Sequence, residues 1–210
     1  MRLIQRVTRR LRREIGFVRR RLTNPPLPRR PDGPLLVHIG CGEIDSPDFV
    51  NVDAQPYPHV HHIRDDITDL SMFADASVDL VYMCHVLEHV HRKEIFGVLG
   101  EFRRVLKPGG VLRIAVPDFD LLIAMYEDIG RDPDGIIAPL LGSHANAYDI
   151  HYWVFTERSL TSILLKAGFS VVRKWNPHQC DHHAFEDWAS RRIERDGKQF
   201  PVSLNLEAVR

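Results

Sequence analysis

The chain has 210 residues, of which 44% are hydrophobic and 27% charged, so it is long enough to bury the core of one domain. No apolar run approaches the roughly 20 residues that span a bilayer, and the basic N-terminus lacks the apolar core of a signal peptide, so neither feature is expected. None of the three cysteines is in a CxxC spacing. We therefore expect a reducing compartment and a cytoplasmic location.

The formal net charge of zero hides an uneven distribution. Residues 1–30 contain eleven arginines and a single acidic residue, Glu14, which gives them a formal charge of +10. The remaining residues carry 17 basic and 27 acidic side chains, a formal charge of −10. This division indicates two regions with different roles. A nucleic-acid partner is not favoured, because the acidic part would repel a phosphate backbone.

A basic amphipathic helix is predicted over residues 1–22, where apolar residues recur every three or four positions with arginines between them. The prolines and glycine of residues 23–34 cannot continue a helix, so this range is predicted to be a linker. Three functions are compatible with this helix. It would bind an anionic membrane surface at the inner face of the membrane, or it would bind nucleic acid, or it would serve as a partner-binding or poorly ordered tail. Its composition also fits a mitochondrial transit peptide.

From residue 35 onward, strands are predicted to alternate with helices. The strand candidates are short apolar or β-branched runs bounded by turn residues: 35–39, 49–53, 61–64, 78–83, 111–116, 169–175 and 202–209. The helix candidates have apolar periodicity or a capping residue: 92–106, Asp118 to about 126, and Thr156 to 166. Residues 130–155 have no clear period. The pattern predicts one Rossmann-like α/β domain over residues 35–210, with a mostly parallel sheet of about seven strands.

Glycines and acids follow the first strands, and in such a sheet ligands bind where the strands end. Gly40-Cys41-Gly42 follows the first strand, and glycines let backbone N–H groups approach a ligand. Asp53 ends the second strand, where its carboxylate can accept both hydroxyl groups of a ribose. Asp66 opens a turn after the third strand. These positions predict a nucleotide-like ligand at this edge of the sheet.

Six motifs occur in the order found in one family. They are Gly40-Cys41-Gly42, Val52-Asp53, Asp66-Ile67, Val78-Asp79-Leu80-Val81-Tyr82, His85-Val86-Leu87-Glu88-His89 and Arg104-Val105-Leu106-Lys107-Pro108-Gly109-Gly110. Together they resemble the class I S-adenosylmethionine (SAM)-dependent methyltransferases of type 11. The resemblance covers residues 35–120 and, more loosely, 150–175. It implies that SAM is the cofactor.

The resemblance also implies roles for individual residues. Gly40 and Gly42 would contact the methionine part of SAM, and Asp53 would hold the ribose hydroxyl groups. Asp66 and Ile67 would face the adenine. Cys84 and His85 would lie beneath the sulfonium.

The chain departs from the family between the first two strands. Only residues 43–48 separate the glycine turn from Phe49, so the first crossover helix is expected to be vestigial and the pocket more open there. This shortened form, with residues 113–118 and the Ala167-Gly168-Phe169 turn, resembles a subgroup of small methyltransferases associated with bacterial cell-surface polysaccharide synthesis. That resemblance implies a saccharide or a related small acceptor, which includes lipid-linked glycans.

Methyl transfer to an alcohol needs alignment of the reactants and removal of the hydroxyl proton, and histidine suits the second task near neutral pH. His151 is the first candidate for this base, because it lies in the segment where the architecture usually places its acceptor-binding insertion. His89 is the second. Each is also compatible with a structural, hydrogen-bonded role. No metal is expected, because neither histidine cluster (59–62 and 178–183) has a recognised zinc spacing.

Two rival functions are weighed against the methyltransferase. The shortened crossover motivates a binding protein that keeps the fold and the cofactor site but has lost turnover. A nicotinamide-dependent dehydrogenase would share the glycine turn and the strand-end acid, but the chain lacks GxGxxG with its following helix. The prediction is therefore a SAM-dependent methyltransferase that acts on a hydroxyl group. Its acceptor and its oligomeric state do not follow from the sequence.

Overall fold

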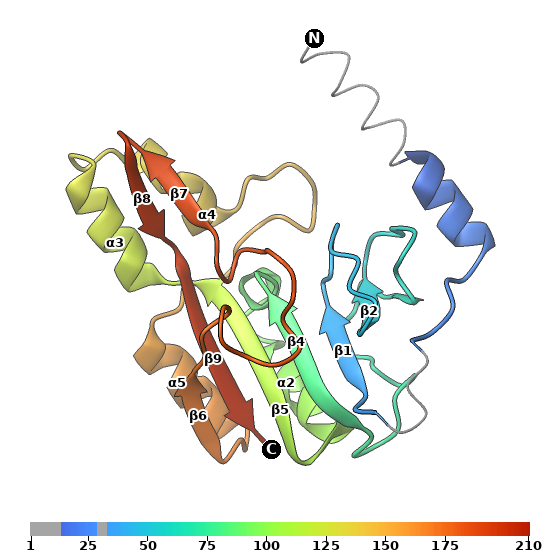
Figure 1. Cartoon of the computed structure of the whole chain (residues 1–210). Helices are drawn as coiled ribbons and strands as arrows, with labels where there is room; N and C mark the ends of the chain where they lie inside the picture. Colours follow the sequence, from blue (N-terminus) through green and yellow to red (C-terminus); the bar gives the residue numbers. More distant parts are fainter. Residues whose placement is uncertain (1–13, 29–32) are drawn as a thin grey trace.

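The computed structural model describes residues 14–28 and 33–210. Its centre is a seven-stranded sheet with the strand order β3-β2-β1-β4-β5-β9-β6 (Figure 1). The strands are β1 (Leu36–Ile39), β2 (Val50–Asp53), β3 (His62–Ile63), β4 (Val78–Cys84), β5 (Leu106–Pro117), β6 (Val171–Lys174) and β9 (Ser203–Val209). Strands β1 to β5 pair in parallel, whereas β9 is antiparallel to both β5 and β6. The predicted mostly parallel sheet of about seven strands is confirmed.

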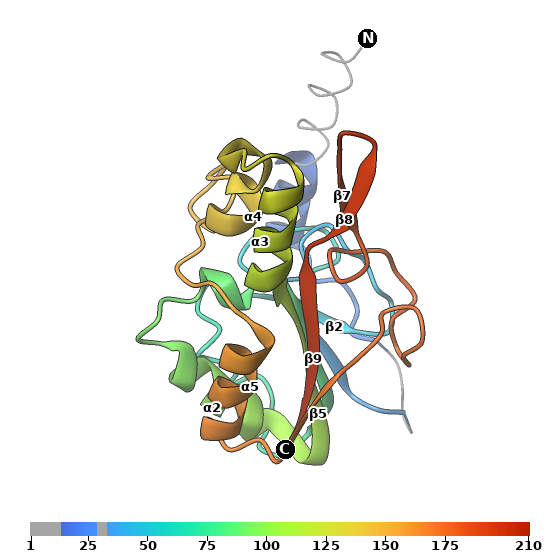
Figure 2. The ribbon, with the colours of Figure 1, turned by 90° about the vertical axis from the view of Figure 1, so that its left-hand side faces the viewer.

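The helices lie mainly on one side of the sheet. Helices α2 (Ile95–Val105) and α5 (Glu157–Lys166) cover one face (Figure 2). Helices α3 (Phe119–Asp128) and α4 (Ile137–Leu141) follow the carboxyl end of β5 (Figure 1). Two short 3₁₀ helices are present, η1 (Leu87–His89) and η2 (Pro133–Gly135). Both predicted caps are confirmed, because the side chains of Asp118 and Thr156 accept backbone hydrogen bonds at the starts of α3 and α5.

Alternate residues of the central strands enter two separate cores. Val37, Ile39, Val81 and Met83 belong to the large core, which contains the buried residues of α2 and α5. Residues that alternate with these enter a smaller core on the opposite face, together with Trp175 and Phe185: Leu36, Leu80 and Tyr82. Apolar residues of these strands therefore face both sides of the sheet, as expected where both faces of a parallel sheet are covered.

The first crossover contains no helix, as predicted. Only ten residues separate β1 from β2, yet the two strands pair in parallel, with Val37 opposite Val50. Right-handed crossovers that run in opposite directions along a sheet place their helices on opposite faces, so a helix here would lie on the face opposite α2. That face is covered instead by residues 175–190, whose Phe185 stacks on the buried ring of His38 at 5.7 Å.

The strands differ from the prediction in two places. Strand β5 begins at Leu106 rather than at residue 111, because Leu106 pairs with Val78 before an irregularity in the register. The prediction also has no strand between residues 175 and 202, and this is wrong. Strands β7 (Arg192–Arg195) and β8 (Lys198–Pro201) form a separate hairpin. Its two turn residues, Asp196 and Gly197, have φ values of +51° and +75°, as in a type I′ turn.

The N-terminal segment contacts the domain. Residues 14–22 are helical, while residues 1–13 of the predicted helix and 29–32 of the predicted linker lie outside the described residues. The guanidinium group of Arg20 is buried and donates hydrogen bonds to the carbonyl oxygens of Val60 and His61. The ring of Phe17 packs edge-on against Tyr57 at 5.0 Å. No helix within residues 14–28 and 33–210 has the length and hydropathy needed to cross a membrane.

Candidate functional site

The chain bends sharply after β1, at Gly40-Cys41-Gly42. Gly40 and Gly42 have φ values of +64° and +55°, in the left-handed region that costs other residues about 1–2 kcal/mol. A Cβ atom on Gly40 would also lie 2.3 Å from Cγ2 of Val86, whereas a Cβ atom on Gly42 would meet nothing within 4 Å. Gly40 therefore lets the bend pack closely against the segment that follows β4.

The carboxylate of Asp53, at the end of β2, meets this bend. Its Oδ2 accepts a hydrogen bond from the N–H of Gly42 at 2.7 Å, and its Oδ1 accepts one from the N–H of Gln55 at 2.7 Å. Burial raises the pKa of this carboxyl group, while the two backbone donors oppose the increase. A carboxylate accepts up to about four hydrogen bonds, so each oxygen keeps capacity for a hydroxyl group of a ligand.

A cavity of about 280 Å³, here called the first cavity, opens beside the bend. Five of the residues predicted at the cofactor line it: Gly40, Asp53, Asp66, Ile67 and His85. The other two, Gly42 and Cys84, do not. Gly42 instead holds the carboxylate of Asp53, and Cys84 lines a second cavity. Predicted residues from β1, β2, the loop after β3 and the end of β4 thus converge on one space.

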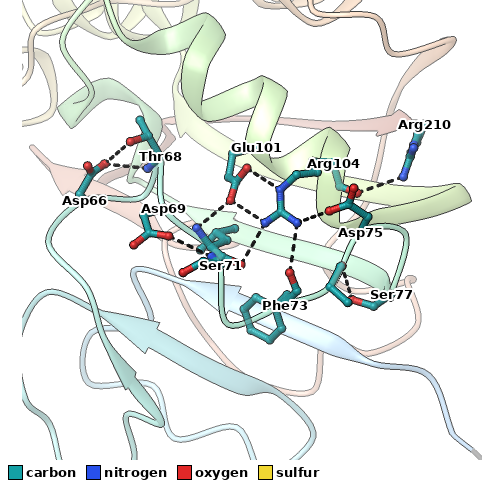
Figure 3. Close-up of polar contacts among 12 residues, drawn as sticks. Asp66, Thr68, Asp69, Ser71, Phe73, Asp75, Ser77, Glu101, Arg104 and Arg210 are labelled. Atoms are coloured by element: carbon teal, nitrogen blue, oxygen red, sulfur yellow. Dashed lines mark hydrogen bonds and ion pairs between the residues drawn. The ribbon is translucent and has the colours of Figure 1, made fainter.

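The loop that carries Asp66 and Ile67 is fastened to α2 by Arg104 (Figure 3). Arg104 donates to both carboxylate oxygens of Glu101 at 2.7 Å and to Asp75 at 2.5 Å. It also donates to the carbonyl oxygens of two loop residues, Leu70 and Phe73. The arginine of the Arg104–Gly110 motif therefore positions one wall of the first cavity.

His85 has an unusual backbone and a fixed ring. Its φ of +53° is in the left-handed region, and its ring lies against the ring of Trp188 at 5.8 Å. Ser203 donates its hydroxyl proton to the carbonyl oxygen of Trp188 at 2.6 Å, so Nε2 of His85, 2.8 Å from that hydroxyl oxygen, is the donor to it. Burial lowers the pKa of His85 to about 3, so the ring is neutral near pH 7.

A second cavity, of about 640 Å³, adjoins the first. His85 and His89 line both cavities, so they lie at the boundary between them. The second cavity is formed by Trp188 and by residues of α4, the 143–151 segment, the β7–β8 hairpin and the ends of β4 and β8. Among these are Cys84, His151, Arg192 and Arg195. A methyl donor in the first cavity and an acceptor in the second would meet at this boundary.

The two histidines predicted as candidate bases lie together. The ring centroids of His89 and His151 are 4.8 Å apart, and both residues line the second cavity. His89 donates its Nδ1–H to the carbonyl oxygen of Ile150 at 3.1 Å, which leaves its Nε2 unprotonated when the ring is neutral. Burial lowers the pKa of both rings, that of His151 to about 4. Both are therefore neutral and hold a lone pair at physiological pH.

Several residues of the site have no role in the prediction. Glu88 belongs to the quoted His85–His89 motif, but the prediction gives it no role. In the structure its side chain is fully buried. Trp188, Ser203 and the arginines of the β7–β8 hairpin come from segments far along the chain. The Asp196-Gly197 pair is a hairpin signal that predicts β7 and β8 from sequence. No local pattern predicts that this hairpin reaches the ends of β4 and η1.

The comparisons with known proteins agree with this geometry. Residues 39–114 match a family model described as "Methyltransferase domain". This range begins at the last residue of β1 and ends within β5, so it contains the glycine bend, Asp53, the Arg104 motif and His85 to His89. A search of curated proteins found no significant match.

Solved structures with the same fold include several methyltransferases. A SAM-dependent methyltransferase of Archaeoglobus fulgidus has a TM-score of 0.54 at 17% identity, over 98% of this chain and 94% of that one. A Thermotoga maritima SAM-dependent methyltransferase, described as a possible histamine N-methyltransferase, has a TM-score of 0.51 at 18% identity, over 84% and 82%. The 1,6-didemethyltoxoflavin-N1-methyltransferase of Burkholderia thailandensis, solved with bound 1,6-didemethyltoxoflavin and S-adenosylhomocysteine, has a TM-score of 0.54 at 18% identity, over 84% and 71%.

Proposed function

We propose that this chain is a SAM-dependent methyltransferase that transfers the methyl group to a hydroxyl of a saccharide or a related small acceptor. The match of residues 39–114 to a methyltransferase domain and the fold shared with solved SAM-dependent methyltransferases support the reaction and the cofactor. The convergence of the glycine bend and Asp53 carries the proposal, because it joins a bare backbone and a buried carboxylate within 2.7 Å beside a cavity.

The residues of the first cavity fit SAM. Asp53 would accept the ribose hydroxyl groups, and Gly40, which lines the cavity, would lie beside the methionine part. Asp66 and Ile67, on the loop held by Arg104, would face the adenine. When bound, SAM supplies an electrophilic methyl group on its sulfonium. The protein supplies alignment, which accounts for much of the rate of such a displacement.

His89 and His151 would act on the acceptor. Both are neutral near pH 7 and line the second cavity, where an acceptor hydroxyl could approach their lone pairs. His151 is the first candidate for the general base, because it lines the second cavity alone, whereas His89 lies at the boundary with the first cavity. General-base assistance of this kind contributes about 10²–10⁴-fold in rate.

The second cavity suits a polar acceptor. Trp188 offers an aromatic surface on which a sugar ring can pack. Arg192 and Arg195 can pair with a phosphate or carboxylate group of the acceptor. A lipid-linked glycan phosphate has both features.

Peripheral membrane binding through residues 1–22 is part of the proposal. Within the described part of this range, Ile15, Val18 and Leu22 are 61%, 58% and 79% exposed, and they lie beside the exposed Arg19 and Arg21. The opposite side of this helical segment is the one that contacts the domain. An apolar stripe flanked by arginines suits the boundary between headgroups and acyl chains of an anionic membrane.

Calorimetry with S-adenosylhomocysteine tests the cofactor site. The wild-type chain should bind it, and Asp53→Ala should weaken binding by at least about tenfold, since hydrogen bonds to a charged group contribute about 1.5–3 kcal/mol. Asp69→Ala is the matched control, because Asp69 lies outside the lining of the first cavity. No binding by the wild type would sink the proposal. Binding without turnover on sugars and lipid-linked glycans would favour a binding protein of the same fold.

A further inference from the structure

We propose that Glu88, His89 and His151 form a binding site for a divalent transition-metal ion of the zinc class, at the edge of the second cavity. Each residue offers one ligand atom, and these atoms all lie within 4.8 Å of one another. Within residues 14–28 and 33–210, no other group of three His, Cys, Asp or Glu residues comes this close. Neither histidine cluster considered from the sequence does so.

The three ligands come from two segments that the fold brings together. Glu88 and His89 are adjacent in η1, after β4, while His151 follows α4. Backbone hydrogen bonds join the segments, because the N–H of Tyr152 donates to the carbonyl oxygen of Glu88 at 2.8 Å. Zinc bonds of about 2.0–2.2 Å place ligand atoms roughly 3–4 Å apart. Binding would therefore draw the most widely separated of the three atoms together by about 1–2 Å.

The strongest indication is the carboxyl group of Glu88. Its side chain is fully buried, and neither of its oxygens has a hydrogen-bond partner among the described residues. The nearest basic atom is Nδ1 of His85, at 3.4 Å. Since His85 uses Nε2–H toward Ser203, this Nδ1 holds a lone pair in the neutral ring and offers no proton to Glu88. In the ionised form that a metal ligand takes, this buried group would have no partner, which is costly, and a metal ion would supply one.

The two histidines are placed to share a metal ion. The Nδ1–H of His89 donates to the carbonyl oxygen of Ile150, an arrangement that orients metal-binding histidines and leaves Nε2 for the ion. The ring of His151 packs against that of His89, with ring centroids 4.8 Å apart.

Two nitrogens and one carboxylate oxygen leave a coordination position open. This is the ligand set of several catalytic zinc sites, and it also suits other transition metals. Because His89 and His151 line the second cavity, the open position would be available to an oxygen atom of an acceptor there. This use rests on the proposed function, but metal binding itself does not. With the ion bound, the histidines would act on the acceptor by holding its oxygen through the metal.

Metal titration of the protein tests the proposed site. Full-length protein, purified without a histidine tag and stripped with a chelator, is titrated with Zn²⁺ by calorimetry and with Co²⁺ by absorption. We expect one equivalent per chain, with binding weakened by at least about tenfold in His151→Ala. The matched controls, His144→Ala and His178→Ala, change exposed histidines outside the cluster and should bind like wild type.

Two outcomes would overturn the site: no binding of either ion by the wild type, or binding that His151→Ala leaves unchanged. Circular dichroism of each variant checks that it folds. Binding of S-adenosylhomocysteine by the same stripped protein separates the two proposals. Metal binding without cofactor binding would keep the metal site and sink the methyltransferase, and the reverse result would do the opposite.

Discussion

At Gly40 the backbone conformation and the available space both exclude a side chain, whereas at Gly42 only the conformation does. The two glycines have the same place in the motif, so sequence alone does not separate them. Their difference arises because Val86, which follows β4, packs against the bend. The close approach of these two segments is what brings the glycine bend to the first cavity.

We therefore expect Gly40→Ala to lower the free energy of unfolding by more than about 2 kcal/mol, since it combines left-handed strain with a clash. Gly42→Ala should cost only about 1 kcal/mol, from strain alone. Urea denaturation of both variants measures the difference. Equal losses would show that Val86 moves aside freely.

Glu88 gives a pH dependence with a definite sign. Burial raises its pKa from 4.5 to about 8 in the metal-free protein, so between these values the folded chain keeps a proton that the unfolded chain has lost. The resulting stability is present in full below pH 4.5 and is lost as the pH rises toward 8. Relative to Glu88→Gln, wild type should lose about 1.4 kcal/mol per pH unit in this range.

Urea denaturation in a chelator at about pH 5.5 and about pH 7.5 measures this slope. The buried histidines titrate in both proteins, so their contribution cancels in the comparison. Parallel stability profiles for the two proteins would contradict the assignment of a protonated Glu88. Added zinc should stabilise wild type more than the variant, if the proposed site binds it.

Among the elements, the loop after β3 depends on α2 for its position. Arg104→Ala removes hydrogen bonds to Glu101 and to two loop carbonyl groups. We expect a loss of about 1–3 kcal/mol in the free energy of unfolding and weaker binding of S-adenosylhomocysteine. Arg103→Ala is the matched control on the same helix, because Arg103 donates to Gly168 rather than to the loop. Equal cofactor affinity in both variants would separate the loop from the site.

The elements predicted from sequence are those with a buried, periodic face. Strands β1, β2 and β4 and helices α2 and α5 supply the large core, and apolar runs or 3.6-residue periods reveal them. Strands β7 and β8 are missing from the prediction because they are exposed and charged, with no apolar alternation. Their only signal is the Asp196-Gly197 turn.

The residues of the candidate site likewise fall into those that the sequence predicts and those that it does not. Positions at the ends of the parallel strands could be predicted, because the topology gathers strand ends at one edge. Trp188 and Ser203 could not, since their approach to His85 depends on how residues 175–203 cross the other face of the sheet. The burial of Glu88 is likewise a property of the assembled fold. It follows from the packing of η1 beneath the 143–151 segment.

For the whole molecule, the N-terminal helical segment presents two different sides. Phe17 and Arg20 hold it against residues 57–61, and Ile15, Val18 and Leu22 remain exposed. Changing these three to serine should reduce sedimentation with anionic liposomes without altering thermal stability or cofactor binding. Sedimentation equal to that of wild type would remove the membrane proposal. Liposomes of neutral lipid are the control, since arginines add little attraction there.

Strand β9 occupies an interior position of the sheet, between β5 and β6, although every other strand precedes it in the chain. About 85 residues therefore separate β5 from β9 in the chain, and this edge of β5 stays unpaired until β9 is in place. Contacts of such long sequence separation slow folding. During synthesis on the ribosome, the nascent sheet would expose the β5 edge until residues 203–209 emerge, and chaperones that shield strand edges would be most useful in that interval.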